Sequence, residues 1–193
     1  ARASFYLRPG RAELNQEEAV KLTYYHEVGL LDDLARSADG SLLTQHDRML
    51  QLKGFLESTL DTRISSYRPA VPGQVSPITL RALEQNGFRT VVPDSTSMRS
   101  TPRIDIAFPQ LLQFTSNNRT EYDILIPEND PSYESLITPL IADAMRVKLE
   151  GGMYQFVFSS TGFASPQYSR VLTSLTRTLK QERFWVTSSR ELD

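Results

Sequence analysis

The sequence predicts an α/β fold in which parallel strands alternate with covering helices. Short apolar runs recur between segments whose apolar residues have helical spacing, over most of the 193-residue chain, and this alternation is typical of a parallel sheet covered by helices. Capping residues and glycine or proline breakers separate the segments. We therefore expect an open sheet or a barrel, in a single domain over residues 1–193 that is cut from a larger protein.

The first half of the chain is predicted to hold strands at both ends of its first and third helices. The first helix follows Asn15, a favoured N-cap residue, and carries Glu17 and Glu18 in its first turn, where the helix dipole favours acids. The third helix opens at Ser76-Pro77 and ends at Asn86-Gly87. The predicted strands are the apolar runs at residues 4–7, 27–31, 63–67 and 88–92.

The second helix is predicted to begin at Thr44. Asp47 lies three residues later, which gives a capping-box-like pair. Helical spacing then places a set of apolar side chains on one face of this helix: Met49, Leu52, Leu56 and Leu60.

The second half of the chain is predicted to hold two long helices. One runs from Asp130-Pro131 to about Glu150, where Gly151-Gly152 ends it, and Pro139 either bends this helix or marks a later start. The other begins at Ser165-Pro166. One or two strands are expected within residues 104–113, and single strands at residues 122–126, 153–158 and 184–187.

Composition excludes several classes of function. The formal net charge of -2 and the pI near 5.8 disfavour a nucleic-acid-binding protein, which normally carries a basic field. The absence of cysteine excludes disulfides, zinc–thiolate sites and thiol nucleophiles. No apolar stretch approaches the roughly 18 residues of a membrane span, so no membrane insertion is expected.

A histidine and three acids lie around the second predicted strand, which makes a metal site conceivable. His26 and Glu27 lie at the amino end of this strand, and Asp32 and Asp33 at its carboxyl end. Because a short strand separates its ends by roughly 15 Å, these side chains cannot all bind one ion. We expect His26 and Glu27 at the far rim of the sheet, and the aspartates in the loop at the carboxyl ends of the strands, where functional groups gather.

Arg68 ends the third predicted strand and precedes a turn stiffened by prolines, Pro69-Ala70-Val71-Pro72-Gly73. An arginine in this place can orient a carboxylate or hold an anionic group through forked hydrogen bonds. It can equally be a surface arginine beside an ordinary loop, and the residues leave both interpretations open.

Two serines, Ser159 and Ser160, follow the strand predicted at residues 153–158. A nucleophilic serine needs a base, and His26 and His46 are the only histidines in the sequence. No Gly-x-Ser-x-Gly elbow surrounds either serine. A strand end with a hydroxyl-capped loop is the favoured interpretation, and His46 is expected to be exposed on the second helix.

Several segments together resemble the NodB-homology polysaccharide deacetylases, and they span nearly the whole chain. Residues 3–7 are similar to the strand that commonly reads Ala-Thr-Phe-Phe, and residues 25–30 to the segment Gly-His-Glu-Ile-Gly-Leu. Residues 68–88 are similar to the family's Arg-Pro loop with the helix and strand that follow it. Residues 151–158 are similar to the strand that normally delivers a histidine, and residues 184–192 to the last strand.

The resemblance implies a distorted (β/α) barrel that removes N- or O-acetyl groups from sugars. In this family one aspartate and two histidines hold a divalent metal, a second aspartate acts as base and a late histidine as acid. Here Leu31 and Ala35 occupy the metal-histidine positions and Ser159 the acid position, whereas Arg68 and Asp94 match. The paired aspartates of the family belong to its first strand, which the resemblance places before residue 1, and we expect this sequence to lack that strand.

Three functional hypotheses follow from the resemblance. The first is a catalytically inactive domain without a cofactor, periplasmic or extracellular, that binds a polysaccharide or another protein domain of the same assembly. The second is an active hydrolase with a divalent metal such as zinc, whose ligands come from upstream sequence and from the aspartates. The third is a sensor or structural module. The residues expected to contact a substrate are Asp32, Asp33, Tyr67, Arg68 and Phe163.

Overall fold

The computed structural model describes residues 3–9, 16–32, 40–70, 75–92, 101–114, 133–158, 166–188 and 191. Contacts divide the chain into two compact units. The sheet unit comprises residues 2–95, 102–115 and 187–193, and the helical unit comprises residues 1, 96–101 and 116–186.

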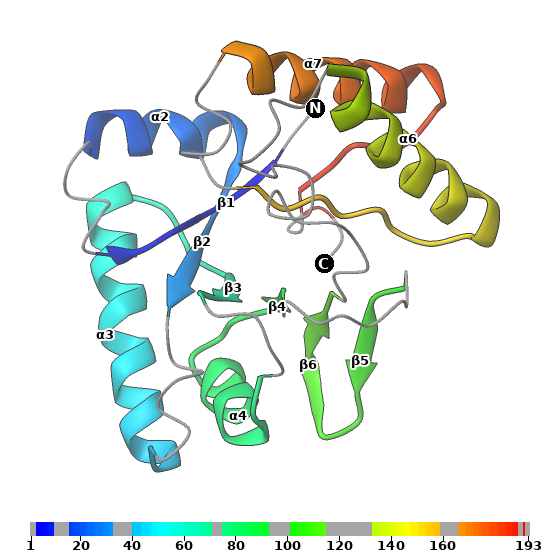
Figure 1. Ribbon diagram of the computed structural model, residues 1–193. Coiled ribbons are helices and arrows are strands. Elements are labelled where there is room, and N and C mark those ends of the chain that lie inside the picture. Colours follow the sequence, from blue (N-terminus) through cyan, green and yellow to red (C-terminus); the bar gives the residue numbers. More distant parts are fainter. Residues whose placement is uncertain are drawn as a thin grey trace. The chain divides into compact units, whose positions relative to one another are not determined.

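A six-stranded, mostly parallel sheet forms the centre of the sheet unit (Figure 1). The strand order is β1-β2-β3-β4-β6-β5, and only β5 runs antiparallel to its neighbour. The bounds are β1 (Ser4–Leu7), β2 (Glu27–Asp32), β3 (Ser66–Pro69), β4 (Thr90–Val91), β5 (Arg103–Asp105) and β6 (Phe108–Gln113). The predicted α/β class is confirmed. In the described part of the chain the strands form an open row, and barrel closure is not seen there.

Three helices cover one face of this sheet: α2 (Gln16–Tyr25), α3 (Leu42–Leu60) and α4 (Pro77–Gln85). Strand residues that point to them alternate with residues on the other face. The core packs Val28, Leu30, Tyr67 and Val91 of the strands against apolar residues of α3, α4 and the α4–β4 connection, namely Met49, Leu56, Leu60, Leu80, Leu83 and Phe88. We call this side the helix-packed face.

The other side of the sheet, which we call the opposite face, carries smaller and more polar residues. Strand register aligns Tyr6 with Gly29 and Ser66 with Thr90, and the Ser66 side chain lies beside Gly29. A Cβ atom at Gly29 would lie 2.7 Å from Cε1 of Tyr6 and in collision with Oγ of Ser66. Glycine is therefore needed here because the Tyr6 ring lies across the strand where a side chain would stand.

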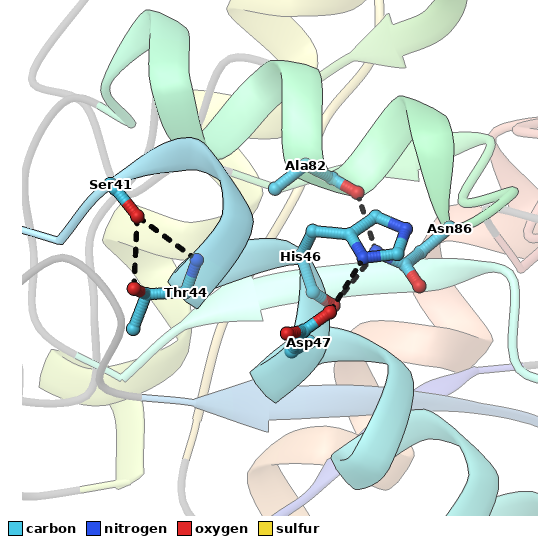
Figure 2. Close-up of polar contacts among 6 residues, drawn as sticks. All are labelled: Ser41, Thr44, His46, Asp47, Ala82 and Asn86. Atoms are coloured by element: carbon cyan, nitrogen blue, oxygen red, sulfur yellow. Dashed lines mark hydrogen bonds and ion pairs between the residues drawn. The ribbon is translucent and has the colours of Figure 1, made fainter.

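The start of α3 differs from the prediction. The helix is capped by Ser41, whose Oγ accepts a hydrogen bond from the Thr44 amide at 3.2 Å (Figure 2). Ser41 has the extended backbone of an N-cap residue, so the helix begins two residues before Thr44. Asp47 consequently makes no capping box, and its Oδ1 instead lies 3.2 Å from Nδ1 of His46.

A buried polar seam joins α3 to α4. The Thr79 hydroxyl donates to Oε1 of Gln45 at 2.8 Å, and both residues are nearly inaccessible. The Asn86 amide nitrogen donates to the backbone oxygens of His46 and Ala82, so this side chain closes α4 and ties it to α3 (Figure 2). Lys53 Nζ donates to the Asn86 carbonyl at 2.7 Å, which leaves this helix end with few unsatisfied groups.

Burial lowers the pKa of Lys53 below its ordinary value of 10.5, against the opposing attraction of Glu57. Between the lowered pKa and 10.5 the unfolded chain binds more protons at this site than the folded chain, so stability rises with pH across that window. We expect Lys53→Met to reduce the alkaline rise of the unfolding free energy, measured by urea titration at several pH values.

Lys21 provides a control of opposite sign. Hydrogen bonds that Lys21 donates to Glu17 and then to Glu18 raise the pKa of Lys21, so its stabilising contribution is lost as pH rises through that raised pKa. Lys21→Met should therefore make the alkaline slope more positive. A Lys53→Met variant with the same slope as the unaltered chain would show that Lys53 titrates alike in both states.

The predicted strand positions need several corrections. The third strand begins at Ser66 rather than at residue 63, and the fourth is only Thr90–Val91. Residues 153–158 show a single bridge at Val157, and residues 184–187 form no strand. Their apolar composition suggested strands, but both segments stay partly exposed, unlike the doubly covered strands of a parallel sheet. Residues 104–113 form the hairpin β5–β6, as predicted, and residues 122–126 lie outside the described residues.

The helical unit contains α6 (Tyr133–Glu150) and α7 (Pro166–Gln181). Leu136, Ile137 and Leu140 pack against Val171 and Leu175. Pro139 lies inside α6 and does not start it. The end of α6 is as predicted, because Gly151 has a φ of 74°, which glycine tolerates. None of the helices in the described ranges is long and apolar enough to span a membrane.

Candidate functional site

The carboxyl ends of β1, β2, β3 and β4 lie at one edge of the sheet, since these strands are parallel neighbours. This edge carries Leu31, Asp32 and Arg68, together with Arg48 from α3. We call this group the carboxyl-end rim. It is the edge where sequence reasoning placed the functional loops, and where parallel α/β sheets usually bind ligands.

Leu31 and Arg68 are neighbours on adjacent strands. The register of β2 and β3 pairs Leu31 with Arg68, and paired residues of parallel strands project from the same face. Both side chains are partly buried. The position that the resemblance assigns to a metal-binding histidine thus holds an aliphatic side chain directly beside the arginine that matches the family.

Asp32 is fixed at the rim by an ion pair with Arg48. Its Oδ1 lies 2.9 Å from Nη2 of Arg48, and the two side chains are 10% and 46% exposed. The Asp32 carbonyl also accepts the Ala70 amide at 2.8 Å. The second carboxylate oxygen, Oδ2, is buried and has no hydrogen-bond partner among the described residues. Asp32 therefore offers one oriented acceptor, whereas sequence reasoning expected a solvated loop residue.

Tyr67 requires a correction. It was expected to contact a ligand, but its side chain is completely buried and packs edge-on against Phe88, with ring centroids 6.2 Å apart. Its register with Val91 places it on the helix-packed face. Strand alternation puts Tyr67 on the face opposite to Arg68, and its complete burial keeps it from contacting a ligand.

Tyr6 is an aromatic residue that sequence reasoning missed. It is partly exposed and lies on the same face as Leu31 and Arg68, because Tyr6 pairs with Gly29, two residues before Leu31. The period-two alternation of β1 opposite a glycine of β2 was the available signal. Arg48 was also missed, since its contact with Asp32 depends on how α3 lies beside β2.

His26 and Glu27 lie at the amino end of β2, as predicted. The Ala3 amide donates to Nδ1 of His26 at 3.3 Å, and the Ser4 hydroxyl donates to Oε2 of Glu27 at 2.6 Å. Both contacts are with the chain at β1, at the end of the sheet opposite to Asp32. The predicted separation of the two groups along β2 is confirmed, and His26 and Glu27 serve local structure.

The described side chains at the carboxyl-end rim do not form a donor set that fits a divalent metal. Leu31 has no coordinating atom, and one oxygen of Asp32 is bound by Arg48. Within the described ranges no group of three or more histidine, cysteine, aspartate or glutamate side chains could hold an ion, whereas hydrolytic metals need at least three protein ligands. His46 is about one-third exposed and contacts Asp47.

Several predicted site residues lie outside the described residues: Asp33, Ala35, Asp94, Ser159, Ser160 and Phe163. Their predicted roles stay predictions.

Comparisons with known proteins show the fold of the polysaccharide deacetylases. No protein-family model and no curated sequence matches the chain. A Mycobacterium smegmatis protein described as a polysaccharide deacetylase has 15% identity and a TM-score of 0.78, over 98% of this chain and 69% of its own. A CE4 family pseudoenzyme from Bacillus anthracis has 13% identity and a TM-score of 0.59, over 100% of this chain and 55% of its own. An allantoinase has 13% identity and a TM-score of 0.73, over 98% of this chain and 65% of its own.

The predicted resemblance is thus confirmed at the level of the fold. The chain spans just over half of the Bacillus pseudoenzyme and about two thirds of the other two proteins. Similar structures include a deacetylase, a pseudoenzyme and an allantoinase, so the fold alone does not fix the chemistry.

Proposed function

We propose that this chain is a catalytically inactive, deacetylase-like domain that binds carbohydrate at the carboxyl-end rim. The observation that carries the proposal is the pairing of Leu31 with Arg68. A hydrolytic metal site requires imidazole or carboxylate ligands at this rim, and an aliphatic side chain beside the matching arginine removes one ligand while leaving the scaffold intact.

The chemistry of the rim suits a polyhydroxyl ligand. Asp32 ends β2 and keeps its carboxylate fixed at the rim through the ion pair with Arg48. Arg68 supplies a donor from the neighbouring strand. The Tyr6 ring, on the same face as Arg68, presents an apolar surface with a polar tip, which supports stacking against a pyranose ring.

The same proposal includes the setting of the domain. A polysaccharide, or another domain of the same assembly, would be the partner, in the periplasm or outside the cell. The presence of a pseudoenzyme among the similar structures supports a binding role for this fold without catalysis.

Glycan binding by the 193-residue chain tests this proposal. The probes are short oligomers of N-acetylglucosamine and O-acetylated xylan, with dextran as the negative control, measured by calorimetry. We expect Asp32→Asn and Arg68→Met each to weaken binding roughly tenfold, about 1.4 kcal/mol, because the first removes the carboxylate charge and the second removes the guanidinium donors from the rim.

Arg146→Met is the matched control. Arg146 is 44% exposed on α6 and pairs with Glu150, so this variant should bind glycan as the unaltered chain does. Absence of binding to every glycan at millimolar concentration would reject the carbohydrate role. Binding that survives both rim substitutions would place the glycan elsewhere on the chain.

A further inference from the structure

The strand β5 forms one edge of the sheet, and two large apolar side chains are exposed at this edge. β5 is the last strand in the sheet order and, within the described residues, pairs with no strand other than β6 (Figure 1). Ile104 in its centre is 61% exposed, and Ile106 in the following turn is 96% exposed. An exposed strand edge with large apolar side chains is a surface on which another strand can pair.

The hydrogen-bond pattern shows which backbone groups of β5 face outward. The amides of Leu112 and Phe114 donate to Arg89 and Val91, at β4. Backbone groups of successive strand residues point to alternate sides, so those of Gln113 face β5 and those of its partner Arg103 face β6. The pairing with β6 stays regular through Ile104, and the register shifts only between Ile104 and Asp105. The amide and carbonyl of Ile104 therefore point away from the sheet.

The charges beside Ile104 make this edge complementary to itself. Arg103 and Asp105 flank Ile104 with opposite charges. An antiparallel strand centred on the same residue would place an arginine opposite each aspartate, and opposite charges in cross-strand pairs are favourable. We propose that two copies of the chain associate by antiparallel pairing of their β5 edges, with Ile104 on the two-fold axis.

Each contact of this dimer follows from the symmetry. The Ile104 amide donates to the carbonyl of Ile104 of the partner subunit, and the reciprocal bond forms as well. Arg103 meets the partner subunit's Asp105, and the Ile104 side chains lie face to face. Pro102 has no amide hydrogen, which keeps the ladder short. A two-fold pairing covers the free edge of β5 in both subunits, so the assembly is a closed dimer and no further copy can add at β5.

Sedimentation velocity over a range of concentrations tests the proposal with the 193-residue chain. The expected result is a rise of the weight-average mass toward that of a dimer as concentration increases. Ile104→Lys, which places like charges on the axis, should stay monomeric at every concentration. Unaltered chain that is monomeric at millimolar concentration, or dimers that Ile104→Lys leaves intact, would overturn the proposal.

A charge exchange makes the test specific for the antiparallel register. Arg103→Glu and Asp105→Lys should each be monomeric alone, because each homodimer would contain two like-charge pairs. An equimolar mixture should form a heterodimer, since both cross-strand pairs then have opposite charges. Recovery in the mixture also shows that Asp105→Lys stays folded, although it removes the Asp105 contact with the Ala107 amide. Variants that dimerise alone, or a mixture that stays monomeric, would contradict the register.

Discussion

Replacing Gly29 with alanine is expected to destabilise the sheet unit by about 1–3 kcal/mol, the usual cost of overpacking a filled site. The new Cβ atom would meet Oγ of Ser66 and lie 2.7 and 2.8 Å from two ring carbons of Tyr6. Both neighbours belong to the strands on either side of β2, and Tyr6 is in register with Gly29, so relief requires moving the Tyr6 ring from its place. The free energy of unfolding in urea measures the effect.

Gly54 supplies the matched control. It lies within α3, and a Cβ atom there would have no neighbour within 4 Å. Gly54→Ala should therefore stabilise the chain by about 0.5–1 kcal/mol, the helix-propensity difference between the residues. Adding Ser66→Ala to Gly29→Ala should recover part of the loss, since it removes the atom nearest to the new methyl group. Equal stability changes for the two glycine substitutions would contradict the close packing of Tyr6 over Gly29.

Replacing Arg48 with methionine is expected to cost about 1–3 kcal/mol, because it leaves a buried carboxylate without its partner. Asp32 is only 10% exposed, and Oδ1 has its ion pair with Arg48. Methionine keeps the packing of the side chain stem but removes the charge. Thermal and urea unfolding both report the change.

The Asp32–Arg48 interaction can be isolated with a double-mutant cycle. Asp32→Asn combined with Arg48→Met should lose less stability than the sum of the single changes, because no unpaired charge remains. Arg146→Met, whose ion pair with Glu150 is exposed on both sides, should cost less than about 1 kcal/mol. Additive effects at Asp32 and Arg48 would mean that the ion pair does not orient the carboxylate at the rim.

The sequence was sufficient for the fold class because caps and breakers act locally. Ser76-Pro77 and Asn86-Gly87 bound α4 where predicted, with Ser76 accepting the Thr79 amide. The start of α3 was misplaced because Ser41 and Thr44 are both good caps, and only the structure shows that the Thr44 amide bonds to Ser41. The apolar run at residues 153–158 was misassigned, because apolarity cannot supply the neighbouring strand that a ladder needs.

At the candidate site, the sequence identified the edge of the sheet but not the direction of each side chain. Arg68 and Asp32 lie at the predicted rim, whereas Tyr67 turns into the core. A shift of one residue along a strand moves a side chain to the other face of the sheet. The composition of the strand therefore could not show to which face Tyr67, the neighbour of Arg68, belongs. The register of β1, β2 and β3 puts Tyr6 on the face that carries Arg68, with β2 between them.

A zinc titration of the purified chain by calorimetry, with the metal content measured beforehand, tests the central claim most directly. Leu31→His combined with Ala35→His is the positive control. This double variant places imidazoles at the two positions that the resemblance to the polysaccharide deacetylases assigns to metal-binding histidines. We predict no metal in the purified chain and no binding at millimolar zinc, with binding gained by the double variant. Stoichiometric, tight binding by the unaltered chain would contradict the account and favour an active metal-dependent deacetylase.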